Sequence, residues 1–266
     1  MIVARRMLAD RRRATAWWAI GTAALVVFTV ALYPAVKDQA QVEDLLKTMP
    51  EAFRNMIGYD AAVPMTSPAG YLHARLFSTV APVLFLVFGI GAGAAAIGGL
   101  EETGRLEPLL ANPVTRARVA AERYAAAIGL LTLLGVVFAV TLAASGRPAG
   151  ALAGISAGHL IAAAAAMLAL AVLHLSLAYA IGAATGRRGP SVAIPAAVAI
   201  GSYLIHSLLP MAEALAPVRY ALPWYWYLQR NILAQGLPPA ALIAPLAMSG
   251  VLFAIGWAAF QRRDLR

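Results

Sequence analysis

The stretch ISAGHLIAAAAAMLALAVLHLSLAYAIGAA, which runs from Ile155 to Ala184, contains no Asp, Glu, Lys or Arg. A helix of about 20 apolar residues crosses the hydrocarbon core of a bilayer. In lipid, the chain itself must satisfy every backbone N–H and C=O group, and a continuous helix does so. The stretch therefore predicts a transmembrane helix, and with it an integral membrane protein.

Five other segments have the length and composition of membrane spans. Of the 266 residues, 61% are hydrophobic and 12% are charged, whereas soluble domains are about half apolar and a quarter charged. We predict an all-α, polytopic integral membrane protein whose single transmembrane domain occupies residues 1–266. The six predicted spans are Ala14–Val36, Leu76–Gly99, Tyr124–Ala144, Ile155–Ala184, Ser191–Leu209 and Ala240–Phe260.

The distribution of basic residues predicts the orientation of the chain. Of the 21 Lys and Arg residues, 14 fall on the side that holds both termini and 7 on the other. Cytoplasmic loops are enriched in Lys and Arg, so we expect both termini in the cytoplasm and the chain in a bacterial plasma (inner) membrane. The basic residues that give the net charge of +9 lie at the edges of apolar runs. This position indicates contact with membrane lipid rather than with nucleic acid.

Three segments outside the predicted spans have patterns of their own. Residues 1–13 are basic and amphipathic, and they predict a helix on the inner membrane surface. Residues 37–73 predict an external loop, in which Val42, Leu45, Leu46, Met49 and Phe53 recur at helical spacing. Residues 210–239 form an external element with four adjacent aromatic residues, which indicates either an interfacial aromatic belt, favoured by composition, or a re-entrant helical hairpin.

The lysines exclude nucleotide binding by a phosphate loop in this chain. Such a loop needs Gly-x-x-x-x-Gly-Lys-Ser/Thr, and the two lysines, Lys37 and Lys47, lie in the predicted external loop. The glycine-rich run GIGAGAAAIGG lies inside a span, where Gly91, Ala95 and Gly99 predict a face for close helix packing. No metal-ligand spacing occurs, and the absence of cysteine excludes thiol chemistry. We therefore expect no cofactor and no metal site in this chain.

Three histidines and two phenylalanines are candidates for a substrate path. His159 and His174 lie on the fourth predicted span and His206 on the fifth, and ionisable residues inside a membrane face the bundle interior or a cavity. They indicate either neutral side chains bonded to a neighbouring helix or a polar patch on a substrate path. Phe85 and Phe88 would line an apolar cavity, which suits a hydrophobic or amphiphilic substrate such as a drug, an antibiotic or a lipid.

A membrane serine hydrolase is one alternative. GISAG, from Gly154 to Gly158, matches Gly-x-Ser-x-Gly, but a nucleophile elbow needs a strand before the serine, and here a membrane helix begins. Ser156 and His206 have no visible third group or oxyanion donor, so no catalytic residue is assigned and the chain is not expected to be an enzyme.

The segment between the second and third spans, GGLEETGRLEPLLANPVTRARVAAERY (Gly98–Tyr124), is rich in charge. Glu101 and Arg105 are spaced four apart, which supports a helical turn, and Leu106, Leu109 and Leu110 form an apolar stripe. Asn112 is predicted to cap a second helix with Pro113 at its first position. Residues 100–123, called the elbow below, are therefore predicted as helix, break and helix, either resting on the bilayer or docking a cytosolic partner.

The elbow sequence resembles the cytosolic signature of ABC-2 type permeases, the transmembrane subunits of bacterial ABC exporters. Eleven residues occupy signature positions: Glu101, Glu102, Gly104, Leu106, Glu107, Leu109, Leu110, Pro113, Thr115, Arg116 and Arg118. Pro108 departs from the signature, and the ending FQRRDLR is also similar to that of the family. The resemblance implies a type V exporter-like transmembrane domain that pairs with a second permease chain, identical or related.

In that family, the elbow fits a groove on an ATP-binding subunit. The resemblance therefore implies two copies of a separate ATPase, which would carry ATP and Mg, and a role in ATPase coupling for all the signature residues above except Thr115. The implied function is ATP-driven export of a hydrophobic or amphiphilic substrate. A stand-alone secondary transporter is the other alternative, but it would need acidic residues in the spans, and all twelve acidic residues lie outside the predicted ones.

Overall fold

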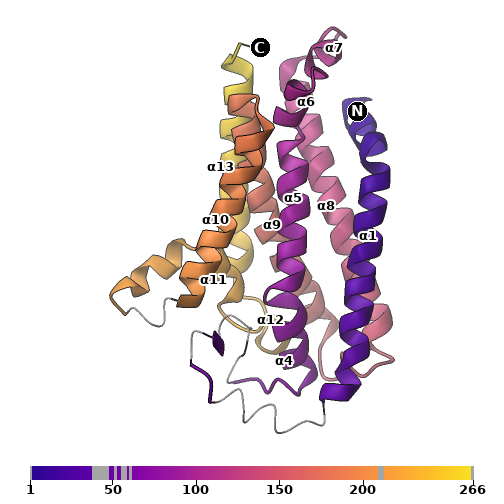
Figure 1. The fold of residues 1–266 in the computed structure, drawn as a ribbon, viewed down its shortest axis with the longest axis vertical. Coiled ribbons are helices and arrows are strands. Elements are labelled where there is room, and N and C mark those ends of the chain that lie inside the picture. The colour runs from indigo at the N-terminus through magenta and orange to yellow at the C-terminus, as the bar shows by residue number, and fades with distance from the viewer. Residues whose placement is uncertain are drawn as a thin grey trace.

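The computed structural model describes residues 2–37, 48–50, 53–54, 59, 62–208 and 213–264. These residues contain six helical segments long and apolar enough to cross a membrane and no strand, which confirms the predicted all-α, six-span architecture. Figure 1 shows the long helices side by side. The spanning segments are α1 (Ile2–Val36), α4 to α5 (Pro68–Ala94), α8 (Arg116–Gly146), α9 (Ala157–Thr185), α10 (Arg188–Leu208) and α13 (Ala240–Arg262).

Helix α9 is the central helix, since it packs against α13, α5, α10 and α8. Glycine makes its contact with α5 (Val80–Ala94) close. A Cβ atom added at Gly93 would lie 2.3 Å from the carbonyl oxygen of Leu175, and one at Gly89 would lie 3.2 Å from that of Ala171. Small residues at a helix interface allow two backbones to approach in this way.

The prediction that Gly91, Ala95 and Gly99 form the packing face is wrong. A Cβ atom at Gly91 would meet no atom within 4 Å, so this face of the helix is open. In addition, α5 ends at Ala94, so that Ala95 and Gly99 do not continue its stripe. The face that packs on α9 is the neighbouring one, with Gly89 and Gly93.

The second span is interrupted near its N-terminal end. It begins with α4 (Pro68–Leu72), capped by the Ser67 hydroxyl, which accepts a hydrogen bond from Gly70 N at 3.1 Å. A π-helical turn, η1 (His73–Phe77), follows before α5 starts at Val80. Pro82 lies in the first turn of α5, where no backbone N–H is needed, so the proline marks a helix start rather than a kink. The span thus begins before the predicted Leu76.

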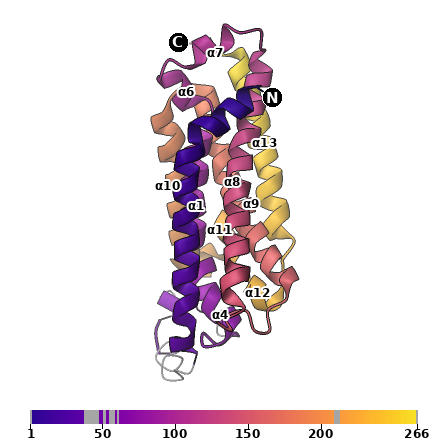
Figure 2. The same cartoon turned by 90° about the vertical axis from the view of Figure 1, so that its right-hand side faces the viewer.

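The segments predicted at either end of α1 have different outcomes. Residues 2–13 are helical but continuous with the first span, and Figure 2 shows that this end of α1 leans away from the rest of its axis. Glu122 of α8 holds this end, because its Oε2 accepts hydrogen bonds from Val3 N (3.1 Å) and Ala4 N (3.2 Å). Of the amphipathic stretch predicted from Val42 to Phe53, residues 42–47 and 51–52 lie outside the described residues.

The element after α10, which was predicted to be external, is helical and partly buried. It contains a 3-10 helix, η3 (Glu213–Ala221), followed by α11 (Pro223–Leu228) and α12 (Ile232–Gln235). Trp224 is 1% exposed, and its Nε1 donates to the carbonyl of Ala199 at 2.9 Å. The hydroxyl of Tyr227, also buried, donates to the carbonyl of Phe77 at 2.7 Å. These two aromatic residues therefore anchor the element to the bundle, which contradicts a simple interfacial belt.

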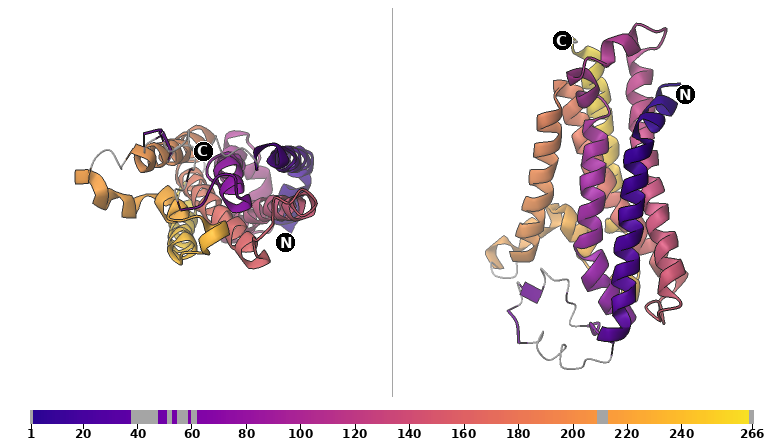
Figure 3. Two further views of the ribbon diagram at one scale, coloured as in Figure 1. Left: turned by 90° about the horizontal axis from the view of Figure 1, so that it is seen from below. Right: turned by 45° about the vertical axis from the view of Figure 1, so that its right-hand side comes forward.

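Helix α5 lies between α10 and α1 in Figure 1 and in the right panel of Figure 3. It contacts both helices, and its contact with α10 is the more extensive. Val80, Val83 and Val87 of α5 are each 44% or more exposed. Because these residues are spaced three and four apart, they share one face of the helix, and that face is uncovered in the single chain.

Candidate functional site

The first half of the elbow turns sharply at Gly104. Helix α6 (Gly98–Glu102) ends there, and Gly104 has a φ of +66°, a left-handed conformation that favours glycine. Its N–H bonds to Glu101 O at 2.8 Å, and Arg105 N bonds to Leu100 O at 2.9 Å, which is the Schellman pattern of a helix C-terminus. Glu101 and Arg105 thus lie on opposite sides of a helix end, and the predicted i,i+4 pair does not form.

Helix α7 (Leu106–Leu110) explains Pro108, the departure from the family signature. The proline is the third residue of α7, and the first N–H groups of a helix have no partner within it, so the missing N–H has no cost. Leu106 is 1% exposed and packs in a cluster with Ile97, Val119 and Phe260, and Leu109 and Leu110 lie against the same cluster. The predicted leucine-rich inner face is therefore confirmed.

The second half of the elbow restarts at Thr115. The Thr115 hydroxyl accepts a hydrogen bond from Arg118 N at 3.2 Å, and its extended backbone is that of an N-cap residue. Asn112 and Pro113, predicted as cap and first position, lie before this point. Asn112 instead donates from Nδ2 to the carbonyl of Pro108 at 2.9 Å, so it satisfies the end of α7 rather than the start of α8.

We expect Thr115→Ala to lower the free energy of unfolding by about 1 kcal/mol, the usual cost of removing an N-cap hydroxyl. Thr115→Ser is the matched control, since serine caps as well as threonine, and it should show little change. The measurement is thermal unfolding of the purified protein in detergent. A larger effect for Asn112→Ala than for Thr115→Ala would mean that Asn112 is the capping residue.

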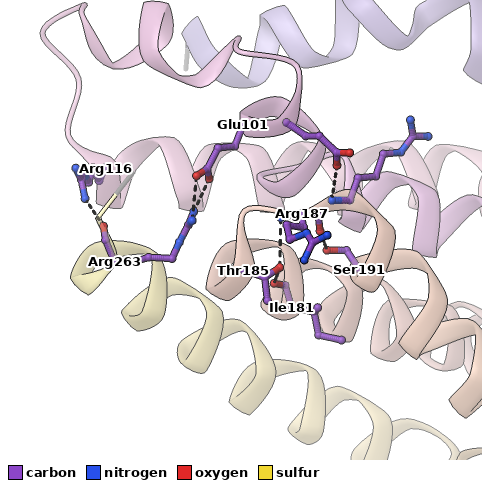
Figure 4. A network of polar contacts seen from close by, with 9 residues as sticks. Glu101, Arg116, Ile181, Thr185, Arg187, Ser191 and Arg263 are labelled. Atoms are coloured by element: carbon purple, nitrogen blue, oxygen red, sulfur yellow. Dashed lines mark hydrogen bonds and ion pairs between the residues drawn. The ribbon is translucent and has the colours of Figure 1, made fainter. Parts of the chain in front are cut away.

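An ionic network fixes the elbow to the start of α10 and the end of α13 (Figure 4). The guanidinium of Arg263, just after α13, binds both carboxylate oxygens of Glu101, with an Nη1 to Oε1 distance of 2.9 Å. The side chain of Glu101 is 7% exposed and that of Arg263 is 18% exposed. Arg116, at the start of α8, donates from Nη1 to the carbonyl of Arg263 at 2.8 Å. The bidentate geometry of the Arg263–Glu101 pair is the strong form of an arginine–carboxylate interaction.

Glu102 binds the start of α10. Its Oε2 accepts a hydrogen bond from the backbone N–H of Arg188 at 2.7 Å, and a carboxylate at a helix N-terminus satisfies a free N–H and the helix dipole. The turn before α10 lies against the Glu101–Arg263 pair, because a Cβ atom at Gly186 would meet the Glu101 carboxylate at 2.7 Å. Ser191, in the first turn of α10, donates to the carbonyl of Arg187 at 2.6 Å (Figure 4). Glu101, Glu102, Arg116, Arg188 and Arg263 are called the ionic base below.

Arg123 of α8 is buried at 7% exposure and binds the end of α5. Its Nη2 donates to the carbonyl of Ala95 at 3.0 Å, and its Nε donates to the carbonyl of Ala96. A cation at this position complements the partial negative charge at a helix C-terminus. Sequence reasoning placed Arg123 only at the edge of a span, and its partners on α5 are too distant in sequence to give a local signal.

The ten residues predicted for ATPase coupling fall into three groups. Glu101, Glu102 and Arg116 belong to the ionic base, while Leu106, Leu109 and Leu110 pack inward. Gly104, Glu107, Pro113 and Arg118 are exposed, although Arg118 also pairs with Glu122 at 2.8 Å. The exposed residues Gly104, Arg105, Glu107, Pro108, Ala111, Asn112 and Pro113 form the surface called the elbow tip below.

The three histidines have separate surroundings. His159 Nδ1 lies 3.1 Å from the carbonyl of Leu233 in α12. His174 is buried in α9, with Nδ1 2.9 Å from the carbonyl of Leu170 and with no hydrogen-bond partner for Nε2 among the described residues. The ring of His206 lies 6.1 Å from that of Tyr225. His159 thus bonds to a neighbouring helix, and a substrate path through these residues stays a prediction.

The two candidate phenylalanines pack in the core, and the candidate serine caps a helix. Both phenylalanines are buried in the core, where Phe85 pairs edge-on with Phe138 and Phe88 with Trp18. Ser156 caps α9, since its hydroxyl accepts a hydrogen bond from His159 N at 3.1 Å. The described residues contain no group of three His, Asp or Glu side chains arranged to hold a metal ion.

Fold and site together define a polytopic helical membrane protein in which an elbow between two spans is fixed to the ends of two further helices. The chain belongs to the ABC-2 family, because a family model described as ABC-2 family transporter protein matches residues 1–265. No curated protein matches the sequence. Permeases of this family are transport subunits that normally work with an ATP-binding subunit. The family thus supports an ABC permease over the serine hydrolase and the secondary transporter.

Proposed function

We propose that this chain is the permease subunit of an ATP-driven exporter and that the elbow tip docks on a separate ATPase. The observation that carries the proposal is the contrast between the two parts of the elbow. The elbow tip is exposed, whereas the ionic base holds the same segment to the start of α10 and the end of α13. A force applied at the tip therefore reaches α10 and α13 through short, charge-assisted contacts, and α8 along the chain itself.

The elbow tip offers a docking partner charged groups rather than apolar surface. Arg105 and Glu107 present opposite charges next to the neutral Asn112, and mixed charges of this kind set register and orientation at an interface. Leu106 is already buried within the chain, and Leu109 and Leu110 are partly buried against the same cluster, so the leucines contribute less to docking than the exposed charges do. This limits the direct coupling role that the family resemblance implies for the leucines.

The assembly that we propose contains two permease chains and two ATPase chains. ATP and Mg are bound by the ATPases, and closure of the ATPases moves the elbows. The resulting motion of α8, α10 and α13 switches the bundle between inward and outward access, which drives export across a bacterial plasma membrane with the termini in the cytoplasm. Because the spans are apolar with few polar groups, the substrate is hydrophobic or amphiphilic, such as a drug, an antibiotic or a lipid.

Single cysteines test the docking surface, because the natural chain contains none. We expect Glu107→Cys and Asn112→Cys to cross-link to a co-expressed partner ATPase through a short heterobifunctional reagent that joins a thiol to a lysine. Ala153→Cys is the matched control: Ala153 is also exposed, but it lies at the opposite end of the bundle between α8 and α9. It should give no cross-link. Equal cross-linking from both ends, or none from the tip, would contradict the docking proposal.

A further inference from the structure

Four arginines surround one cavity at the elbow end of the bundle. The cavity has a volume of about 210 Å³, and its cationic residues are Arg11, Arg105, Arg123 and Arg188. They come from α1, the elbow, α8 and the start of α10, so four distant parts of the chain place a positive charge here. The rest of the lining is small or apolar, such as Met7 and Leu100, apart from Thr103 and the single acid Asp10.

The chain does not neutralise this charge with its own groups. Glu101 binds Arg263, and Glu102 binds the backbone N–H of Arg188, so neither lines the cavity. Arg11 donates from Nη2 to the carbonyl of Gly91 at 3.3 Å, and Arg123 binds the last carbonyls of the same helix. A helix C-terminus contributes only about −0.5 of a charge. With Asp10, this leaves a clear surplus of positive charge.

An open apolar face leads from the cavity toward the middle of the bundle. The exposed residues Val80, Val83 and Val87 are followed at helical spacing by Gly91. The carbonyl of Gly91 accepts a hydrogen bond from Arg11, and a Cβ atom added at Gly91 would meet no atom within 4 Å. Beyond Gly91, Ala95 and Gly99 line the cavity. An uncovered apolar face that ends in a basic cavity matches a ligand with an apolar chain and an anionic head.

We propose that this cavity binds the phosphate of an anionic phospholipid from the leaflet at this end of the bundle, with an acyl chain along α5. Guanidinium groups bind phosphate in bidentate geometry, and basic pockets between transmembrane helices bind anionic head groups. A free phosphate has the same head chemistry but would leave the valine face uncovered. This site shares Arg105 with the elbow tip, but lipid binding requires no docked ATPase.

The test uses the full-length protein in neutral detergent. Thermal unfolding is followed while dioleoyl phosphatidylglycerol, dioleoyl phosphatidylcholine or inorganic phosphate is added. We expect phosphatidylglycerol to stabilise the wild type most, and the Arg11→Gln/Arg188→Gln double variant to bind it about 25-fold more weakly, about fivefold for each charge. Arg147→Gln/Arg230→Gln is the matched control, because both arginines are exposed and lie far from the cavity. It should bind as the wild type does.

A conservative variant separates binding from folding. Arg11→Lys/Arg188→Lys retains both charges and should recover most of the affinity lost by the glutamine variant. Equal binding of phosphatidylglycerol by wild type and glutamine variant would overturn the site. Equal effects of phosphatidylcholine, or of inorganic phosphate, would overturn the anionic lipid as its occupant. Release of phosphatidylglycerol when a partner ATPase binds would assign the cavity to a protein contact instead.

Discussion

Replacing Glu101 with Leu is expected to lower the free energy of unfolding by about 3–5 kcal/mol. Removing one partner of a buried ion pair leaves the other charge uncompensated, and this range is the usual cost. The guanidinium of Arg263 would lose both of its acceptors, and its Nε already lacks one among the described residues. Because the Arg263 side chain keeps 18% exposure, we expect the lower end of the range.

The double variant Glu101→Leu/Arg263→Met makes this prediction specific. Replacing both members of a buried pair with apolar side chains of similar size is often neutral, so the double variant should recover most of the stability that each single variant loses. Arg262→Met is the matched control, because Arg262 is the exposed neighbour of Arg263 and its loss should change little. Thermal unfolding in detergent measures all four. Additive losses in the double variant would show that the two residues are not coupled.

Most of the fold follows from hydropathy alone, because a membrane span is a property of a continuous segment. The six spans were predicted correctly in number and order, and the fourth, fifth and last predicted spans agree closely with the helices, whereas the first and third helices start earlier than predicted. The second span was predicted poorly at both ends. Its N-terminal end contains the π-helical turn at His73–Phe77, and its C-terminal end stops at Ala94, where Arg123 binds the next carbonyls.

The residues of the candidate site could be predicted from the sequence, but the partners that they bind could not. The leucine stripe follows from local spacing, so the inner face of the elbow was predicted correctly, but the charged outer face was correct only in part, because Glu101 is buried. The partners of Glu101 and Glu102 are Arg263 and the backbone of Arg188, far along the chain. Local spacing favoured Arg105 as the partner of Glu101. The Schellman turn at Gly104 separates those two residues, and tertiary contacts decide the pairing.

The largest effect in the transmembrane region is expected for Gly93→Ala. The added Cβ atom would lie 2.3 Å from the carbonyl oxygen of Leu175 and 3.1 Å from the Cβ of Ala178. The first contact is with the backbone of α9 and cannot be relieved by rotating a side chain, so α5 and α9 must move apart. Overpacking of this kind costs about 1–3 kcal/mol, and we expect the upper part of that range with a matching fall in the melting temperature.

Gly91→Ala is the control that makes the experiment decisive, since it adds the same methyl group to the same helix. No atom lies within 4 Å of its Cβ position, and alanine favours a helix over glycine by about 0.5–1 kcal/mol, so this variant should be unchanged or slightly more stable. A comparison of the two melting temperatures therefore tests which face of α5 packs on α9. If Gly91→Ala destabilises the protein as much as Gly93→Ala, then the stripe of Gly91, Ala95 and Gly99 is the packing face after all, and the open face of α5 that leads to the arginine cavity does not exist.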